Sequence, residues 1–443
     1  MPFRIVVVLI IEIAGAVGAA GYPYLGLLAL LFVTFGRPQD DRPNVTDLHI
    51  PMILVISITV GMLMRLSSSA PAVLAAIKRL KIILVLYALM VISALNNWTE
   101  LSKSRLYDFT TVIFLCVLTL ALVTTEKRLR GYIAMLLVSG AYVVIGVIRN
   151  PSHIVEEIGG EQFERMAIAK GGTLFGNSNY LALFMVLTIF LSLTLMAFYR
   201  SVWQRAILLS LAGGAGYVFF RANSRGASFA LAIGLLFLWF ISKARIKNAV
   251  LGLVLVGCGS LLAPQSYWDR LNTVAHYEED RSATDRLDLW QIALKLIGEH
   301  PVLGVGPDNF TLYAPNSPHD AYLQIASEVG VPALLVYITT LLAGLCAVWR
   351  VRRFSTREPQ SFSYYDAAYK GTFCCLLAIV IQGFTTGLAH REFVYALVTL
   401  SFCVEGLAEK AQAVTIDSAP VGPAPLEPTF ESIAEPWGVL RLR

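Results

Sequence analysis

Long apolar stretches alternate with short polar ones along most of the chain. A membrane-spanning helix needs about 20 mostly apolar residues, so this pattern predicts an all-α polytopic membrane protein with about 12–13 transmembrane helices. The lower number applies if the first two stretches form one broken element. The predicted spans are 4–20, 22–36, 51–66, 80–97, 107–124, 131–148, 178–199, 205–220, 226–242, 247–263, 329–349, 371–388 and 392–408.

Basic residues gather in alternate loops between these spans. Lys and Arg near helix ends favour the cytoplasmic side. The loops predicted to be cytoplasmic carry Lys78/Arg79/Lys81, Lys127/Arg128/Arg130, Arg200/Arg205, Lys243/Arg245/Lys247 and Arg350/Arg352/Arg353/Arg357. The loops predicted to face the periplasm of a bacterial cell are 37–50, 98–106, 149–177, 221–225, 264–328 and 389–391.

The composition agrees with a membrane protein. Of the 443 residues, 56% are apolar and 15% are charged, and the mean hydropathy is +0.65. A soluble domain averages about 25% charged residues, so a soluble fold is excluded. The net charge of +5 argues against nucleic acid as a partner. Gly304-Val305-Gly306 lacks the Lys-Ser/Thr of a phosphate loop, which disfavours an ATP-driven pump.

The lengths of the segments predict four parts. Residues 1–263 form the N-terminal transmembrane helices, and 264–328 form one large periplasmic loop with short helices. Residues 329–410 form the C-terminal transmembrane helices, and the proline-rich residues 411–443 form a disordered cytoplasmic tail. The large loop far exceeds the ~12–15 residues of ordinary connections, so we expect a folded functional element there.

Two helix starts are predicted within the large loop. Ser282 and Asp285 form a capping-box pattern ahead of an apolar stripe that begins at Leu289. Arg286 lies in the first turn of that helix, one turn before Trp290. The guanidinium of Arg286 either extends from an interfacial helix to water or binds a phosphate group at the membrane surface.

The second helix start surrounds a histidine. Ser317 suits the N-cap and Pro318 the first helical position, which places His319 in the first turn. The positive end of the helix dipole disfavours imidazolium there, so the ring can accept a proton. His319 is therefore a candidate general base, with a structural role as the alternative.

Other polar residues flank the predicted spans. Arg221 and Arg225 suit an anion pocket, or they contact lipid headgroups. Asn177 and Asn179 either cap the helix that follows them or serve a site that the glycines before them let the backbone approach. His390 and Arg391 either join the site or form a short polar turn.

A metal site is not indicated by spacing. All six histidines lie in loops predicted to be periplasmic, with no HxH or HExxH pattern among them.

Several of these motifs occur together in one known family. Arg286 with Trp290, His300-Pro301 with Gly304-Val305-Gly306, His319 with Tyr322-Leu323, and Glu328-Val329-Gly330 resemble the signature of the O-antigen ligase and polymerase superfamily of bacterial membrane glycosyltransferases. Ser224-Arg225-Gly226 and Gly176-Asn177-Ser178-Asn179 resemble its earlier elements.

The resemblance implies a metal-independent, cofactor-free enzyme of the inner membrane with a fold like the C-type glycosyltransferases. It would take a glycan from undecaprenyl diphosphate at the periplasmic face and transfer it to an acceptor hydroxyl, of lipid A core in a ligase. Arg225 and Arg286, with Arg221, would hold the diphosphate, and His319 would be the general base. Asn177, Asn179, Trp290, Glu328, His390 and Arg391 are candidate supporting residues.

Other functions stay open from the sequence. A polysaccharide polymerase or a protein O-oligosaccharyltransferase would use the same donor. A lipid-linked oligosaccharide transporter would place charged residues along a path through the membrane. Polar residues instead gather at one face here, which favours chemistry at the membrane surface.

Overall fold

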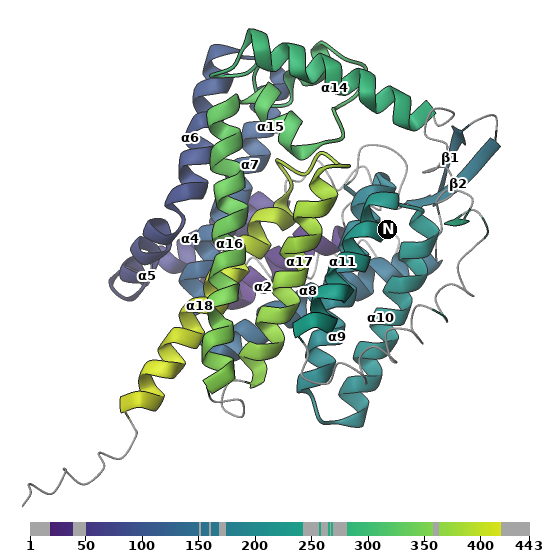
Figure 1. The fold of residues 1–443 in the computed structure, drawn as a ribbon. Helices are drawn as coiled ribbons and strands as arrows, with labels where there is room; N and C mark the ends of the chain where they lie inside the picture. Colours follow the sequence, from purple (N-terminus) through teal and green to yellow (C-terminus); the bar gives the residue numbers. More distant parts are fainter. Residues whose placement is uncertain are drawn as a thin grey trace, which may run out of the picture.

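The computed structural model is a bundle of long helices (Figure 1). It describes residues 18–38, 50–149, 152–158, 161–167, 174–241, 281–357 and 363–417, with Gly257, Gln265, Tyr267 and Trp268. The helices are α2 (Pro23–Gly36), α4 (Ile50–Leu63), α5 (Leu66–Arg79), α6 (Lys81–Asn96), α7 (Glu100–Leu122), α8 (Glu126–Arg149), α9 (Ser178–Phe198), α10 (Val202–Ala222), α11 (Arg225–Ile241), α14 (Arg281–Glu299), α15 (Ala321–Glu328), α16 (Val331–Arg357), α17 (Ser363–Gly383) and α18 (Glu392–Asp417).

The predicted all-α polytopic fold is confirmed. Within the described residues, 5 helices are long and apolar enough to cross a membrane: α7, α8, α9, and most of α16 and α17. Helices α2, α4, α6 and α11 are also apolar but shorter. The predicted spans 205–220 and 392–408 correspond to α10 and α18, which meet neither description. The total of about 12–13 spans stays a prediction, because 247–263 and most of 4–20 lie outside the described residues.

Helix α5 was not predicted. It occupies residues between two predicted spans and carries Lys78 and Arg79 in its last turn. Its polar residues interrupt the apolar run, so hydropathy predicts no membrane span there. Leu66 and the alanines nevertheless favour a helix. A short amphipathic helix therefore replaces the expected loop.

The predicted loop 149–177 contains a β-hairpin. Strand β1 (Ser152–Ile158) pairs antiparallel with β2 (Glu161–Ala167), with Ser152 opposite Ala167 and Ile158 opposite Glu161. Gly159 and Gly160 separate the strands in the sequence. Two glycines between strand-like runs favour a tight hairpin turn, so this element could have been predicted.

Two predicted boundaries near the C-terminus are wrong. Helix α17 begins at Ser363, before the expected 371, because Tyr364, Tyr365 and Tyr369 are buried against the bundle although hydropathy ranks them low. Helix α18 continues to Asp417, so residues 411–417 are helical and not part of a tail. Alanines at 411 and 413 suit a helix, and the first tail proline comes only at 420. The rest of the predicted tail, 418–443, lies outside the described residues.

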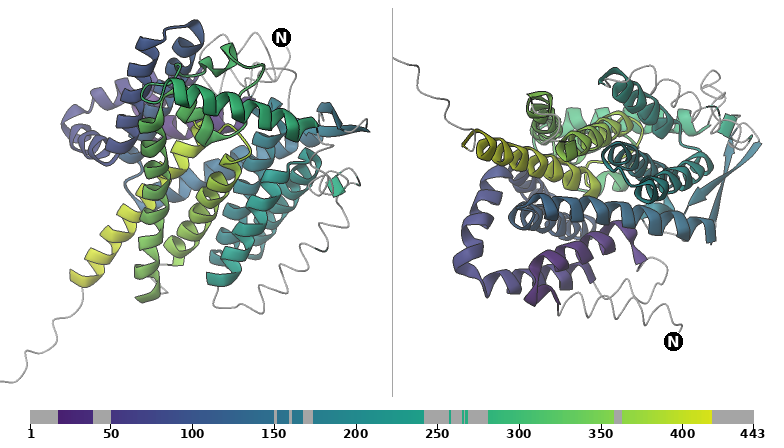
Figure 2. Two further views of the ribbon diagram at one scale, coloured as in Figure 1. Left: turned by 45° about the horizontal axis from the view of Figure 1, so that its top comes forward. Right: turned by 90° about the horizontal axis from the view of Figure 1, so that it is seen from below.

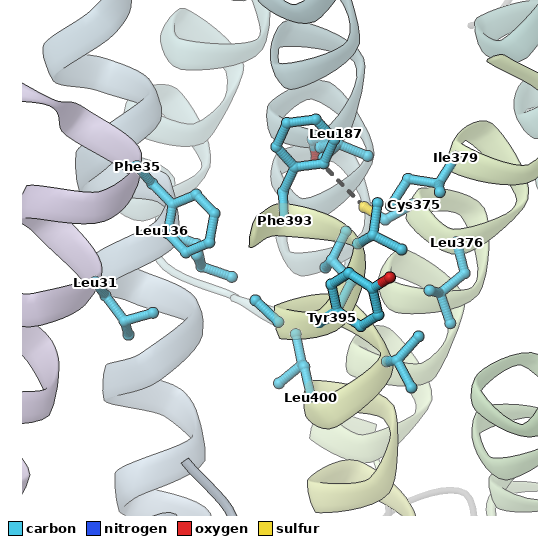
Figure 3. Close-up of a cluster of buried hydrophobic side chains, with 14 of the residues drawn as sticks. Leu31, Phe35, Leu136, Leu187, Cys375, Leu376, Ile379, Phe393, Tyr395 and Leu400 are labelled. Carbon is cyan, nitrogen blue, oxygen red and sulfur yellow. Dashed lines mark hydrogen bonds between the residues drawn. The ribbon is translucent and has the colours of Figure 1, made fainter. Parts of the chain in front are cut away.

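Helix α9 is the centre of the bundle. It is buried along nearly its whole length and packs against α8, α10, α11 and α17. Figure 3 shows the neighbouring core, where Leu187 of α9 faces α17 and Phe393 and Tyr395 project from α18. The Cys375 thiol donates to the carbonyl oxygen of Leu187 over 3.6 Å. This packing holds the ends of α9 and α17 in fixed positions.

Among the described residues, some loops of each predicted set meet at one end of the bundle. At one end, here called the basic end, Arg130 lies over the rings of Phe198 and Tyr364, at 5.0 and 4.6 Å. At the other end, here called the site end, the Ser102 hydroxyl donates to the carbonyl oxygen of Pro307 over 3.0 Å. Helix α14 lies across the site end (Figures 1 and 2).

Candidate active site

The segment between α14 and α16 folds onto the start of α7 and the end of α6. The Ser93 hydroxyl donates to the carbonyl oxygens of Leu303 and Glu328, over 2.5 and 3.0 Å. Gly304 has φ +62°, and a Cβ there would lie 2.4 Å from the carbonyl carbon of Glu328. Only glycine fits so close an approach in this conformation. The glycine pair of the sequence motif therefore allows this segment to pack against α15.

Helix α14 confirms the predicted apolar stripe. Leu289, Ala293 and Leu296 are buried in a cluster that includes Val305 and Phe310. The helix begins at Arg281, however, so Ser282 lies inside the first turn and the predicted capping box is wrong. The clustered stripe fixes the face of α14 that turns toward the bundle.

Trp290 connects α14 to the loop that carries His319. Its indole Nε1 donates to the carbonyl oxygen of Pro318 over 3.0 Å. Arg286 lies one turn earlier on the same side of α14, because residues four apart are neighbours on a helix. Arg286 therefore lies one turn from Trp290, and His319 lies next to its partner Pro318; both Arg286 and His319 are half-buried.

The cap of α15 differs from the prediction. Asp320, and not Ser317, is the N-cap, and its carboxylate accepts from the backbone N–H groups of Tyr322 and Leu323, both over 2.8 Å. A carboxylate satisfies two amide donors better than a hydroxyl and also complements the helix dipole. His319 therefore precedes the cap and is not in the first helical turn.

His319 adopts a left-handed backbone conformation, with φ +52°. Such a conformation costs a residue with a Cβ about 1–3 kcal/mol, and residues that bear it cluster at functional sites. Asn223, which precedes the Ser-Arg-Gly element, is also left-handed, with φ +50°. A left-handed position thus lies at His319 itself and directly before the Ser-Arg-Gly element.

The Ser224-Arg225-Gly226 element forms the sharp turn from α10 to α11. The Ser224 hydroxyl donates to Oδ1 of Asn179 over 2.9 Å, and both side chains are buried. Asn177 caps α9 by accepting from the backbone N–H of Asn179 over 2.9 Å. The two asparagines therefore support the turn and the helix start, and Arg225 is the first residue of α11.

The end of α17 brings the two motifs together. The Tyr322 hydroxyl, three residues after His319, donates to the carbonyl oxygen of Val380 over 2.9 Å. A Cβ at Gly226, next to Arg225, would lie 2.1 Å from Oγ1 of Thr385. Residues 380–385 therefore contact the neighbours of both His319 and Arg225. Arg221 stands apart from these contacts, with its guanidinium 5.7 Å from the ring centre of Tyr217.

Gln382 is a supporting residue that the sequence analysis did not identify. Its amide Nε2 donates to the backbone oxygen of Asn179 over 2.8 Å, deep in the protein. A glutamine followed by Thr385 and Thr386 at the end of an apolar span was the available signal. Such buried polar groups join α17 to the start of α9.

Glu328 and His390 form a buried pair. Glu328 Oε2 lies 2.8 Å from His390 Nε2, and their side chains are 1% and 2% exposed. The same oxygen accepts from the backbone N–H of Asp308 over 3.0 Å. The pair joins the end of α15 to the turn before α18, so His390 is enclosed by protein and does not form an exposed polar turn.

Arg391 is the next residue of the same turn and contacts a different part of the bundle. Its guanidinium is 4.4 Å from the ring centre of Tyr180, whose hydroxyl donates to the carbonyl oxygen of Gly387 over 2.8 Å. An arginine over an aromatic face is held there by its attraction to the ring. Tyr180 follows Asn179 directly, so Arg391 is adjacent to the elements that hold Arg225.

The chemistry available at the site end is that of arginines and an imidazole. Among the described residues, no group of three or more His, Cys, Asp or Glu side chains is arranged to hold a metal ion. Half-buried guanidiniums suit a phosphate, and an imidazole suits proton transfer.

Comparison with known proteins agrees with these motifs. Residues 207–338 match a family model described as O-antigen ligase. No curated protein matches the chain. The matched segment includes Arg225, Arg286 and His319, together with Trp290 and Glu328. Residues 207–338 of the chain are therefore similar to the O-antigen ligase family.

Proposed function

We propose that the protein transfers an oligosaccharide or polysaccharide from undecaprenyl diphosphate to an acceptor hydroxyl of lipid A core. The reaction would take place at the periplasmic face of the bacterial inner membrane, at the site end of the bundle. The observation that carries the proposal is the contact of residues 380–385 with the neighbours of both His319 and Arg225. The Trp290 bond to Pro318 adds Arg286 to the same region.

The arginines would bind the donor diphosphate. Departure of the diphosphate builds negative charge, which guanidiniums held in a partly dry site stabilise without reorganising. Arg225 and Arg286 are the principal ligands in this proposal, and Arg221 and Arg391 are supporting ones. No metal or cofactor is required, because the fixed cations supply the charge that the leaving group needs.

His319 would act as the general base. It would remove the proton of the acceptor hydroxyl as the oxygen attacks the anomeric carbon, while the bond to the diphosphate breaks. General-base catalysis contributes about 10²–10⁴-fold. Attack from the side opposite the leaving group inverts the anomeric configuration, so the product linkage should be opposite to the donor linkage.

The test uses proteoliposomes that contain an undecaprenyl-diphosphate glycan, with and without lipid A core. Release of undecaprenyl diphosphate and the size of the glycan product are measured. Wild type should turn over donor only with lipid A core, and His319→Ala, Arg225→Gln and Arg286→Gln should lose at least about 100-fold. The control is His300→Ala, which removes an exposed imidazole from the same segment.

Other outcomes identify other functions. A ladder of longer glycans without lipid A core would indicate a polymerase, and transfer to a protein would indicate an O-oligosaccharyltransferase. Movement of intact donor across the bilayer without diphosphate release would indicate a transporter. Full turnover by His319→Ala would contradict the assignment of the base.

A further inference from the structure

A groove opens at the basic end, far from the candidate active site. It has a volume of about 480 Å³ and is lined by the start of α2, the turn from α4 to α5 and the turn from α7 to α8. The lining residues that carry polar groups include Arg65, Ser69, Thr124 and Arg128. Helix α7 begins at the site end and has 23 residues, so the groove lies roughly 33 Å from that end, at 1.5 Å per residue.

Arg128 has only neutral partners in the part of the chain that the structure describes. Its guanidinium donates to the carbonyl oxygen of Leu122 over 2.9 Å and to the hydroxyl of Thr124 over 3.3 Å. It also lies over the ring of Tyr24, 5.4 Å from the centre. The nearby carboxylate of Glu126 pairs with Arg130 instead. The charge of Arg128 is therefore not neutralised by a described carboxylate.

Arg65 contributes a second guanidinium to the groove from another helix pair. It donates to the carbonyl oxygen of Gly21 over 2.5 Å, at the start of α2. Arginines from two separate turns thus line one groove, which gives it a positive character suited to an anion.

The rim of the groove is apolar and open. Tyr22, Leu25 and Met64 are 71%, 56% and 75% exposed. Helix α5, which lines one wall, exposes Leu74 and Ile77 and ends in Lys78 and Arg79. A short helix with exposed apolar side chains and a basic end is typical of helices that lie at the membrane interface. The groove therefore opens toward lipid, at the level of the headgroups.

We propose that this groove binds an anionic phospholipid, with its phosphate between Arg128 and Arg65 and its acyl chains along the apolar rim. The occupant follows from charge complementarity with the arginines and from the exposed apolar side chains around them. A free phosphate ion would use the guanidiniums but would leave the rim uncovered.

The experiment measures lipid retention by the purified full-length protein. The protein is equilibrated in nanodiscs of equal phosphatidylglycerol and phosphatidylcholine, transferred to mild detergent, and analysed by native mass spectrometry. Wild type should retain phosphatidylglycerol in preference to phosphatidylcholine. Arg128→Gln and Arg65→Gln should each reduce that retention about fivefold, from the attraction of one basic residue for an anionic membrane. Arg128→Lys should keep most of it.

The matched control is Arg205→Gln. Arg205 lies at the same end, is exposed and donates to a backbone carbonyl as Arg128 does, but it does not line the groove. The Arg205→Gln variant should retain lipid like wild type.

Equal retention of the two lipids by wild type, unchanged retention in Arg128→Gln, or an equal loss in Arg205→Gln would overturn the proposal. Inorganic phosphate that displaces the lipid at millimolar concentration would also overturn it, by showing that the acyl chains contribute nothing. Lipid retention needs no donor turnover, so this test is independent of the proposed reaction.

Discussion

At the scale of single residues, the backbone conformation of His319 affects the stability of the protein, whereas its side chain is the proposed general base. A left-handed conformation suits glycine and strains any residue with a Cβ, so the strain at φ +52° exists for histidine and alanine alike. The wild-type chain keeps a histidine there despite this cost. That is expected of a side chain whose chemistry is needed at one fixed place.

We predict that His319→Gly and His319→Ala are equally inactive but differ in stability. The glycine variant removes the strain and should be more stable than the alanine variant by about 1–2 kcal/mol. Thermal unfolding of both variants in detergent, followed by tryptophan fluorescence, measures the difference. An alanine variant as stable as the glycine variant would show that the residue relaxes out of this conformation.

At the scale of secondary structure elements, Asp320 holds α15 and the residue before it. Loss of an N-cap side chain costs about 0.5–2 kcal/mol. Asp320→Ala should therefore lower the free energy of unfolding by that amount and also reduce donor turnover, because the cap fixes the backbone next to His319. Asp320→Asn keeps an acceptor and should retain most of both. Asp288→Ala, at an exposed position on α14, is the control and should have little effect.

The pH dependence of the same cap follows from its burial. Burial raises the pKa of Asp320, although the backbone N–H groups of Leu323 and Tyr322 lower it in part. Folding therefore favours the protonated carboxyl. The resulting contribution to the free energy of unfolding is complete below the unfolded pKa of about 3.9. Wild type should lose unfolding free energy relative to Asp320→Asn as pH rises from about 4 through the raised pKa. A relative gain over that range would contradict the assignment.

The elements that sequence patterns missed are those with weak apolar signals. Helix α5 has polar residues within it, and the β-hairpin has no long apolar run. Hydropathy recognises only segments that are apolar along their whole length. Gly159 and Gly160 are the turn signal that the sequence offers for this hairpin.

At the scale of the whole molecule, the Glu328–His390 pair joins segments 62 residues apart in the sequence. Removing one partner of a buried hydrogen-bonded pair typically costs about 1–3 kcal/mol, because the other partner is left buried without its hydrogen bond. Glu328→Leu and His390→Leu should each be strongly destabilising, and the double variant should lose much less than their sum. The exposed pair Glu100–Lys103 is the control and should contribute about 0–1 kcal/mol. Additive losses at 328 and 390 would show that the pair is not coupled.

The placement of the two ends can be tested in cells. In a chain whose native cysteines are replaced by serine, Lys295→Cys and Arg205→Cys place single thiols on exposed positions of α14 and α10. A membrane-impermeant thiol reagent should label only Lys295→Cys in intact spheroplasts. Labelling of Arg205→Cys alone would place the candidate active site in the cytoplasm.

The membrane class, the alternation of basic loops and the motifs of the site follow from the sequence alone. Apolar length, basic residues and short motifs are local properties, so they can be recognised without knowing which helices touch. Arg225, Arg286 and His319 could be named for the same reason, since each lies in a short recognisable element.

How these elements meet follows from packing in three dimensions. The contacts of Tyr322 and Gly226 with the end of α17, the burial of His390 against Glu328 and the groove around Arg128 depend on packing between distant segments. The cap of α15 was also decided this way, because Ser317 and Asp320 both suit an N-cap by sequence. The bond from Trp290 to Pro318 fixes the loop before the helix, and the chain then begins α15 at Ala321. Packing chooses between local alternatives whose intrinsic free energies differ by only about 1 kcal/mol.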